Sequence, residues 1–332
     1  MDILVIVTAN FNMAATSGFL DPFRAANYLD GQQHFRWSLI SVDGGACMAS
    51  NGMTIETESL SKVRGELRDL VIVSASWAPE KYTGGQLQSA LRRWAREGTP
   101  LGAIDTGAFI LARAGLLDGM RASVHYEHID AMNEMFPAVE ASEDLFVFDR
   151  NRMTCCGGVA AMDFALHIIR RSHGERLANE AARYVFHPSL RPEGSHQNSN
   201  PAEPLGPAPP ENVRRAIKVM EENLEETIPI SEICKRIELS QRQLDRLFAK
   251  HVGKTPALYY RDIRLDRARG LVTQTELPLA EVALASGFAS HVHFSRAYRE
   301  RFGLAPRTDR VEGRIPFEFR AWPMHRKKPA RK

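Results

Sequence analysis

The chain has 332 residues, of which 44% are hydrophobic and 25% are charged. This length fits about two domains, and the composition excludes both a disordered chain and a collagen-like one. The formal net charge of +3 conceals an asymmetry: residues 1–200 hold 18 Lys and Arg against 23 Asp and Glu, whereas residues 201–332 hold 25 against 17. This asymmetry predicts that only the second part binds a polyanion.

The four cysteines are too few and too scattered for a disulfide framework, and they show no zinc-binding spacing. Reduced thiols in a cytoplasmic protein are therefore expected. The apolar run at residues 3–7 is too short for a signal peptide, and no run approaches the ~18 residues of a membrane span. We predict a soluble cytoplasmic protein with no metal, cofactor or membrane partner.

Residues 1–186 alternate short β-branched runs with helical patterns. Strands are predicted at 3–7, 37–42, 70–74 and 101–104, and helices at 22–29, 85–97, 107–114 and 157–172. Strands that alternate with helices are typical of a parallel sheet covered on both faces. The first domain is therefore predicted to be a doubly wound α/β domain.

Residues 187–210 are rich in Pro and in small polar residues, which cannot form a core. The charge changes sign at the same place, so we predict a linker over 187–210. An all-helical domain is predicted over 211–312, and a basic tail over 313–332.

The helical domain contains two helix-turn-helix patterns. The first pairs a helix at 231–237 with one that opens at Ser240, and the second repeats this layout over 279–302. A long helix at 257–273 joins them. Because a helix fits the major groove and Arg and Gln can bond base edges, the two units predict DNA binding. The alternative is a helical bundle with a solvated charged surface.

Several motifs of this region resemble the AraC/XylS-type DNA-binding domain. They include Leu239-Ser240-Gln241-Arg242-Gln243-Leu244, Gly253-Lys254-Thr255-Pro256 and Ala285-Ser286-Gly287-Phe288. The resemblance covers about 210–312 and implies that seven residues read bases: Gln241, Arg242, Asp245 and Arg246 in the first unit, and His291, His293 and Arg296 in the second. On the same helix as the first four, Lys250 is expected to contact a phosphate. Asp309 departs from the family, which usually has Tyr there.

Residues 101–109 read as a strand, a sharp turn and the start of a helix, with Asp105 on the turn. Such a turn projects a side chain beside helix N–H groups, and enzymes use it for a nucleophile. Three roles are open for Asp105: a nucleophile, a cap of the following helix, or the partner of a cationic ligand group. The aromatic rings that could assist a cation are Phe11, Trp77, Phe109 and Tyr126.

The stretch Asp105-Thr106-Gly107-Ala108-Phe109, its sequel Ala122-Ser123-Val124-His125-Tyr126, and Asn10-Phe11-Asn12-Met13 resemble the class I glutamine amidotransferase-like domain of the PfpI/ThiJ group. The form carried by GlxA-like regulators is the most similar, and it implies a flavodoxin-like fold. Enzymes of the group have Cys where Asp105 stands, often His where Thr106 stands, and an acidic residue near Asn12. These departures imply a domain without catalytic residues.

The resemblance extends to regulators of betaine, carnitine and arginine metabolism, which implies a small amine, betaine or amino acid as effector. The residues expected to bind it are Phe11, Asn12, Trp77, Asp105, Thr106, Phe109 and His125. We predict a homodimeric regulator, acting as an activator, with promoter DNA as partner. The alternative is a hydrolase or amidotransferase-like enzyme that uses Asp105 and carries a DNA-binding appendage.

Overall fold

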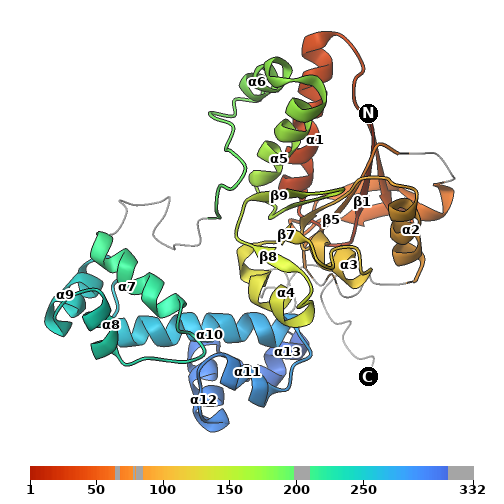
Figure 1. The fold of residues 1–332 in the computed structure, drawn as a ribbon. Helices are drawn as coiled ribbons and strands as arrows, with labels where there is room; N and C mark the ends of the chain where they lie inside the picture. Colours follow the sequence, from red (N-terminus) through yellow and green to blue (C-terminus); the bar gives the residue numbers. More distant parts are fainter. Residues whose placement is uncertain (64–67, 78, 80–84, 198–209, 313–332) are drawn as a thin grey trace. The chain divides into compact units, whose positions relative to one another are not determined.

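The computed structural model describes residues 1–63, 68–77, 79, 85–197 and 210–312. The chain forms two compact units, divided between Gln197 and Asn198. The first is built on a sheet and the second is entirely helical (Figure 1). Each unit is described by itself.

The first unit contains an eight-stranded sheet with the order β3-β4-β2-β1-β5-β6-β10-β9. Its strands are β1 Asp2–Val7, β2 Arg36–Ser41, β3 Gly45–Met48, β4 Thr54–Ser59, β5 Leu70–Ala75, β6 Leu101–Asp105, β9 Phe146–Asp149 and β10 Arg152–Cys155. The six inner strands are parallel, and β3 and β9 pair antiparallel at the two edges. β7 Arg121–Ser123 and β8 Glu140–Ser142 form a separate parallel pair. The predicted doubly wound fold is confirmed.

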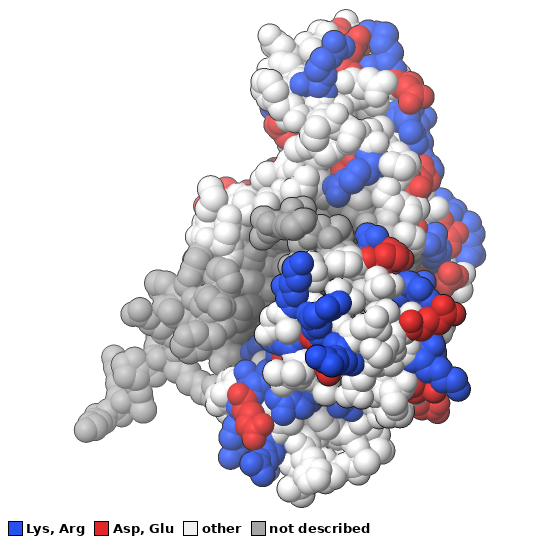
Figure 2. Space-filling view, turned by 90° about the vertical axis from the view of Figure 1, so that its left-hand side faces the viewer, with Lys and Arg blue, Asp and Glu red and all other residues white. Residues whose placement is uncertain are grey.

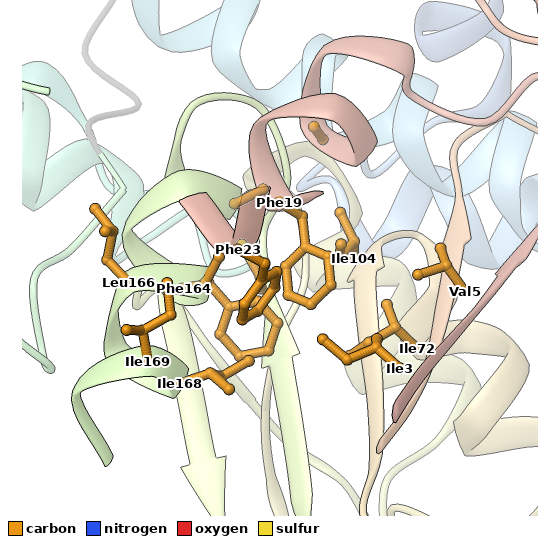
Figure 3. Close-up of a cluster of buried hydrophobic side chains, with 14 of the residues drawn as sticks. Ile3, Val5, Phe19, Phe23, Ile72, Ile104, Phe164, Leu166, Ile168 and Ile169 are labelled. Carbon is orange, nitrogen blue, oxygen red and sulfur yellow. The ribbon is translucent and has the colours of Figure 1, made fainter. Parts of the chain in front are cut away.

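Helices cover both faces of this sheet. One face carries α1 Met13–Asp30, α5 Ala160–His173 and α6 Glu175–Tyr184, and the other carries α2 Gly85–Arg96, α3 Gly107–Arg113 and α4 Ile129–Met135. Short 3₁₀ turns lie at Leu60–Lys62 and Tyr126–His128. Figure 3 shows Phe19 and Phe23 of α1 beside Phe164 of α5, with aliphatic side chains of the sheet to one side of them.

Helix α1 begins nine residues before the predicted helix at 22–29, and Pro22 lies inside it. Its start is fixed by Asn12, whose Oδ1 accepts a hydrogen bond from the Ala15 N–H at 3.1 Å. Ala15, Phe19 and Phe23 then recur at helical spacing and are buried. Cap and apolar stripe together outweigh the cost of the internal proline.

The segment predicted as a linker from 187 onward differs from that prediction. His187 and Arg191 both bond the fully buried carboxylate of Asp163, with Nε2 of His187 at 2.8 Å and Nε of Arg191 at 2.8 Å. Gln197 also bonds within the first unit. Residues 187–197 therefore belong to the first unit. The remainder of the predicted linker, 198–209, and the tail, 313–332, lie outside the described residues.

The second unit contains α7 Glu211–Glu221, α8 Ile230–Arg236, α9 Gln241–His251, α10 Pro256–Gln274, α11 Leu279–Ala285, α12 His291–Phe302 and α13 Pro306–Glu312. It has two hydrophobic cores. The first holds Leu244 and Phe248 of α9, and the second holds Phe294 and Tyr298 of α12. Helix α10 contributes to both, so it is the spine between the two helix-turn-helix units.

Asp309, at the family's usual Tyr position, is fully buried beneath α12. Its Oδ2 accepts hydrogen bonds from Tyr298 Oη at 2.8 Å and from Arg269 Nε at 3.0 Å. The carboxylate thus ties α13 to α10 and α12. The replacement of the family's usual Tyr by Asp309 therefore serves the packing of these helices.

Candidate ligand site and DNA-binding helices

Asp105 ends β6, where the chain turns sharply into α3. Its φ of +58° is left-handed, a conformation that costs a non-glycine residue roughly 1–2 kcal/mol. Two glycines make the turn possible: a Cβ on Gly107 would lie 2.2 Å from the Val73 carbonyl oxygen, and one on Gly157 would lie 2.9 Å from Asp105 Cβ. Strain held in place by close packing is typical of functional turns.

The Asp105 carboxylate lies at the carboxyl ends of β1, β5 and β6, where doubly wound sheets bind ligands. Its Oδ2 accepts a hydrogen bond from Asn12 Nδ2 at 3.1 Å, and the same Asn12 caps α1. Thr106 Oγ1 donates to the Ser76 carbonyl after β5. We call Asp105, Asn12, Ser76, Thr106 and His125 the Asp105 site.

Burial raises the pKa of Asp105, which is only 4% exposed. The charge of His125 opposes this shift, as do hydrogen bonds from Asn12, from the Thr106 backbone and from Ser76. The helix-cap role fits less well, because Thr106 is the N-cap of α3 and no side chain caps that helix. A buried carboxyl whose charged form is poorly solvated gains from a cationic partner.

His125 follows β7 and is half-buried. Its ring stacks on Tyr126 with centroids 4.4 Å apart, and its Nδ1 accepts a hydrogen bond from the Glu127 N–H at 3.4 Å. His125, Glu127 and His128 have ligand atoms within 4.8 Å of one another, an arrangement that could hold a metal ion. Glu127 and His128 were not among the predicted site residues, although the spacing His-Tyr-Glu-His is visible in the sequence.

The predicted aromatic side chains are placed differently from one another. Phe11 has no exposed surface and Phe109 is 7% exposed, so both rings belong to the hydrophobic cores in this conformation. Trp77 is half-buried and Tyr126 is 44% exposed. The expected ring–cation contacts therefore concern Trp77 and Tyr126 more than the two phenylalanines.

A cavity of about 730 Å³ lies at the opposite end of the strands. Its lining includes Asp2, Asn27, Arg36 and Trp37, and it contains no member of the Asp105 site. The Asp105 site has the positioned polar groups, whereas this cavity is an open surface hollow. The positioned polar groups therefore favour the Asp105 site over this cavity as the ligand-binding site.

Helix α9 presents the predicted base-reading residues of the first unit. A capping box starts it: Ser240 Oγ accepts from the Gln243 N–H, and Gln243 Oε1 accepts from the Ser240 N–H at 2.9 Å. With Leu244 and Phe248 buried, the opposite face is exposed, and it carries Gln241, Arg242, Asp245, Arg246 and Lys250. The turn before it contains Glu238 with φ +59°.

Helix α12 is the counterpart in the second unit, with His291, His293 and Arg296 exposed. Arg296 is paired with Glu300 one turn later, Nε to Oε1 at 3.0 Å. Val292 is 73% exposed on the same helix and was not among the predicted DNA-binding residues. An apolar side chain at such a position can contact a thymine methyl group. The turn uses Gly287, where a Cβ would lie 2.5 Å from the Leu224 carbonyl oxygen.

Figure 2 shows Lys and Arg side chains at many places on the visible surface, with Asp and Glu side chains among them. In the sequence the excess of Lys and Arg over Asp and Glu lies in residues 201–332. Lys and Arg in that part of the chain can neutralise phosphates.

Comparison with known proteins gives the family. A DJ-1/PfpI family model matches residues 1–171, and a helix-turn-helix domain model matches residues 233–311. "HTH-type transcriptional regulator GbdR" of Pseudomonas aeruginosa is 40% identical over 301 residues, which is 91% of this chain and 82% of that protein. The chain belongs to the HTH-type transcriptional regulators that join a DJ-1/PfpI domain to an AraC-type DNA-binding domain.

Two further matches agree with this assignment. "HTH-type transcriptional regulator CdhR" of Pseudomonas aeruginosa is 37% identical over 310 residues, which is 93% of this chain and 91% of that protein. A crystal structure of an AraC family transcriptional regulator from Pseudomonas putida has a TM-score of 0.52 and 28% identity, and covers 55% of this chain and 98% of that one. The predicted DNA-binding transcription regulator is thereby confirmed.

No helix in the described ranges has the length and apolar character needed to cross a membrane. The four cysteines are buried and free. Burial raises the pKa of Cys47 to about 11 and raises that of Cys155 as well. Burial and a raised pKa favour the protonated thiol at Cys47 and Cys155, which agrees with a structural role for these two side chains.

Proposed function

We propose that this regulator senses a small cationic metabolite at the Asp105 site and that its sheet domain does no chemistry of its own. The observation that carries the proposal is Asp105 itself, an acidic side chain held at φ +58° on the turn where related enzymes hold a thiol. A strained backbone conformation lowers the stability of the fold, and such strain is typically retained where the side chain has a function. A carboxylate at that position attracts an ammonium or guanidinium group.

The enzyme alternative is less well supported. A nucleophilic carboxylate must be ionised, and burial, which raises the pKa of Asp105, works against ionisation. A cationic ligand group would stabilise the charged form and pair with it. The effector class that fits is an amine, a betaine or an amino acid, with Asp105, Asn12 and His125 as the proposed polar contacts and Trp77 as a proposed aromatic contact.

In the helical unit, α9 and α12 would enter two adjacent segments of the major groove of promoter DNA. Support comes from their exposed Arg, Gln and His side chains and from the buried faces that fix the helices. Arg242 and Arg246 would bond bases and Lys250 a phosphate. We place the protein in the cytoplasm and propose that it activates transcription.

We also propose a homodimer, since two copies would present two pairs of recognition helices to a promoter with two half-sites. Exposed aromatic side chains on the sheet domain offer a contact surface: Tyr28 is 67% exposed and Phe186 is 93% exposed. Light scattering on the full chain and on Phe186→Ser tests this. A monomer at working concentrations excludes the proposal.

The test of the ligand site is a thermal-shift panel of glycine betaine, L-carnitine, choline and L-arginine on the full chain. A compound at 100 times its Kd stabilises the protein by about 2.7 kcal/mol. Asp105→Asn keeps the shape and removes the charge, so affinity should fall by about 1.5–3 kcal/mol. Unchanged affinity in Asp105→Asn contradicts a charge-recognition role, and consumption of a compound by the wild type alone establishes the enzyme alternative.

A further inference from the structure

The last described residue before the helical unit is bonded to the loop that carries His125. The Gln197 side chain donates from Nε2 to the Val124 carbonyl at 2.9 Å and to the Asp144 carbonyl at 3.3 Å. Its Oε1 accepts from the Tyr126 N–H at 2.8 Å. Gln197 thus bonds the residues immediately before and after His125.

A second set of contacts leads from Asp105 to the same segment. Gly157 lies against Asp105, since a Cβ there would come within 2.9 Å of the Asp105 Cβ. The neighbouring Cys156 N–H donates to the Leu145 carbonyl at 2.9 Å, and the Leu145 N–H donates to the Ser195 carbonyl at 2.8 Å. Residues 195–197 are therefore connected to the surroundings of the Asp105 site by two routes, one through Val124 and Tyr126 and one through Leu145 and Cys156.

The backbone of this segment completes the attachment. The Gln197 N–H donates to the Glu143 carbonyl at 2.7 Å, and His196 forms an antiparallel bridge with Asp144. Asp144 itself is buried and ion-paired with Arg121 at 2.9 Å. Within residues 195–197, Gln197 supplies the only side-chain amide. Two of its three side-chain hydrogen bonds go to the backbone of Val124 and Tyr126, so the attachment of residues 195–197 depends on the position of that backbone.

We propose that Gln197 transmits occupancy of the Asp105 site to the DNA-binding unit. This inference rests on the ligand site proposed above. A ligand that engages Asp105 and His125 shifts the 124–126 loop, and the three side-chain bonds of Gln197 strengthen or break with it. Release of residues 195–197 from the sheet domain lengthens the connection between the two units, and their retention keeps that connection short.

The test uses the full chain and a DNA fragment selected from a random library by the wild-type protein. Fluorescence anisotropy gives the Kd for this DNA with and without saturating glycine betaine, L-carnitine or L-arginine, and calorimetry gives the Kd for each compound. The wild type should change its DNA affinity roughly 5–150-fold on binding the active compound. Gln197→Ala should still bind that compound, with a Kd changed by no more than the fold-change that the wild type shows in DNA affinity, but show a DNA effect near onefold.

Two controls sharpen this result. Gln86→Ala changes an exposed glutamine on α2 and should behave as the wild type. Gln197→Glu keeps the acceptor for the Tyr126 N–H and loses both donors, so it should show an intermediate effect. A full ligand effect in Gln197→Ala overturns the inference, and loss of compound binding in Gln197→Ala overturns it as well, because Gln197 would then be part of the binding site.

Failure of the ligand proposal is distinguishable from failure of this one. If no compound binds the wild type, the effector class is wrong, and a cycle of His125→Ala and Gln197→Ala measured on DNA alone decides the coupling. Residues that communicate give non-additive changes in DNA affinity. Non-additivity supports the role of Gln197, and additive changes overturn it.

Discussion

Asp262 is predicted to fix the relative orientation of the two helix-turn-helix units. It lies on α10 between the two cores and is only 6% exposed. Its Oδ2 receives Lys254 Nζ at 2.7 Å, from the turn after α9, and Arg301 Nη1 at 2.9 Å, from α12. One carboxylate therefore links a residue of each unit to the spine. Asp262→Ala removes both links at once.

The size of the effect follows from the exposure of the partners. A hydrogen bond to a charged group contributes about 1.5–3 kcal/mol when it is well buried. Here the Lys254 side chain is 42% exposed and Arg301 is 24% exposed, and Arg301 keeps a bond to Asp266 at 2.6 Å. Both cations can regain water, so the loss is discounted to about 1–2 kcal/mol in total.

Hydrogen exchange on the full chain measures this loss locally, because amides of α10 report the opening free energy of the helical unit. DNA binding measures its consequence. With a rigid pair of units, one base pair inserted between the two contact segments of the selected DNA turns them by about 35° and should reduce affinity strongly. Asp262→Ala should bind the original DNA more weakly and tolerate the insertion better. Unchanged exchange together with an unchanged insertion penalty would refute the reasoning.

Three further predictions concern single residues. Arg242→Ala and Arg246→Ala should each lose about 1–3 kcal/mol on the selected DNA and little on random DNA, whereas Lys250→Ala should weaken both equally and flatten the salt dependence; equal losses on both DNAs for the arginines would contradict base reading. Glu238→Gly should stabilise the helical unit by about 1 kcal/mol, measured by hydrogen exchange, because φ is +59° there; no gain would mean the Glu side chain compensates the strain. Gly157→Ala should destabilise the sheet unit by about 1–3 kcal/mol and weaken ligand binding, because the added Cβ would meet Asp105. Gly158→Ala, with open space around its Cβ, should leave ligand binding unchanged, and similar effects of the two substitutions on ligand binding would argue against the contact.

The parts of the fold that local patterns determine were predictable. The inner strands β1, β2, β5 and β6 and the two helix-turn-helix units follow from periodicity within short windows. The strands β3, β4, β9 and β10 were not predicted: β3 and β4 are mostly half-buried or exposed, and β9 and β10 have only four residues each, too few for a clear pattern. The same holds for residues 187–197, whose composition suggests a linker but whose partner, Asp163, lies 24–28 residues earlier.

For the site, the sequence placed Asp105 on a turn between strand and helix, and the structure has it there with left-handed φ. The polar partner Asn12 was named, but its double role as helix cap and donor to Asp105 depends on the sheet order, in which β1 and β6 lie on either side of β5. The burial of Phe11 and Phe109 depends on side-chain direction, which composition does not reveal. Gln197 was not predicted, because its role arises from three long-range hydrogen bonds.

The most direct test of the central claim is calorimetry of the active compound as a function of pH, in two buffers of different ionisation enthalpy. Burial raises the pKa of Asp105 in the free protein, so at a pH below that raised pKa a cationic ligand that pairs with its carboxylate displaces a proton. Affinity should therefore rise with pH until it passes that raised pKa, with proton release on the acid side, and Asp105→Asn should abolish both. Binding that is independent of pH, releases no proton and survives in Asp105→Asn would contradict recognition of a cation by Asp105.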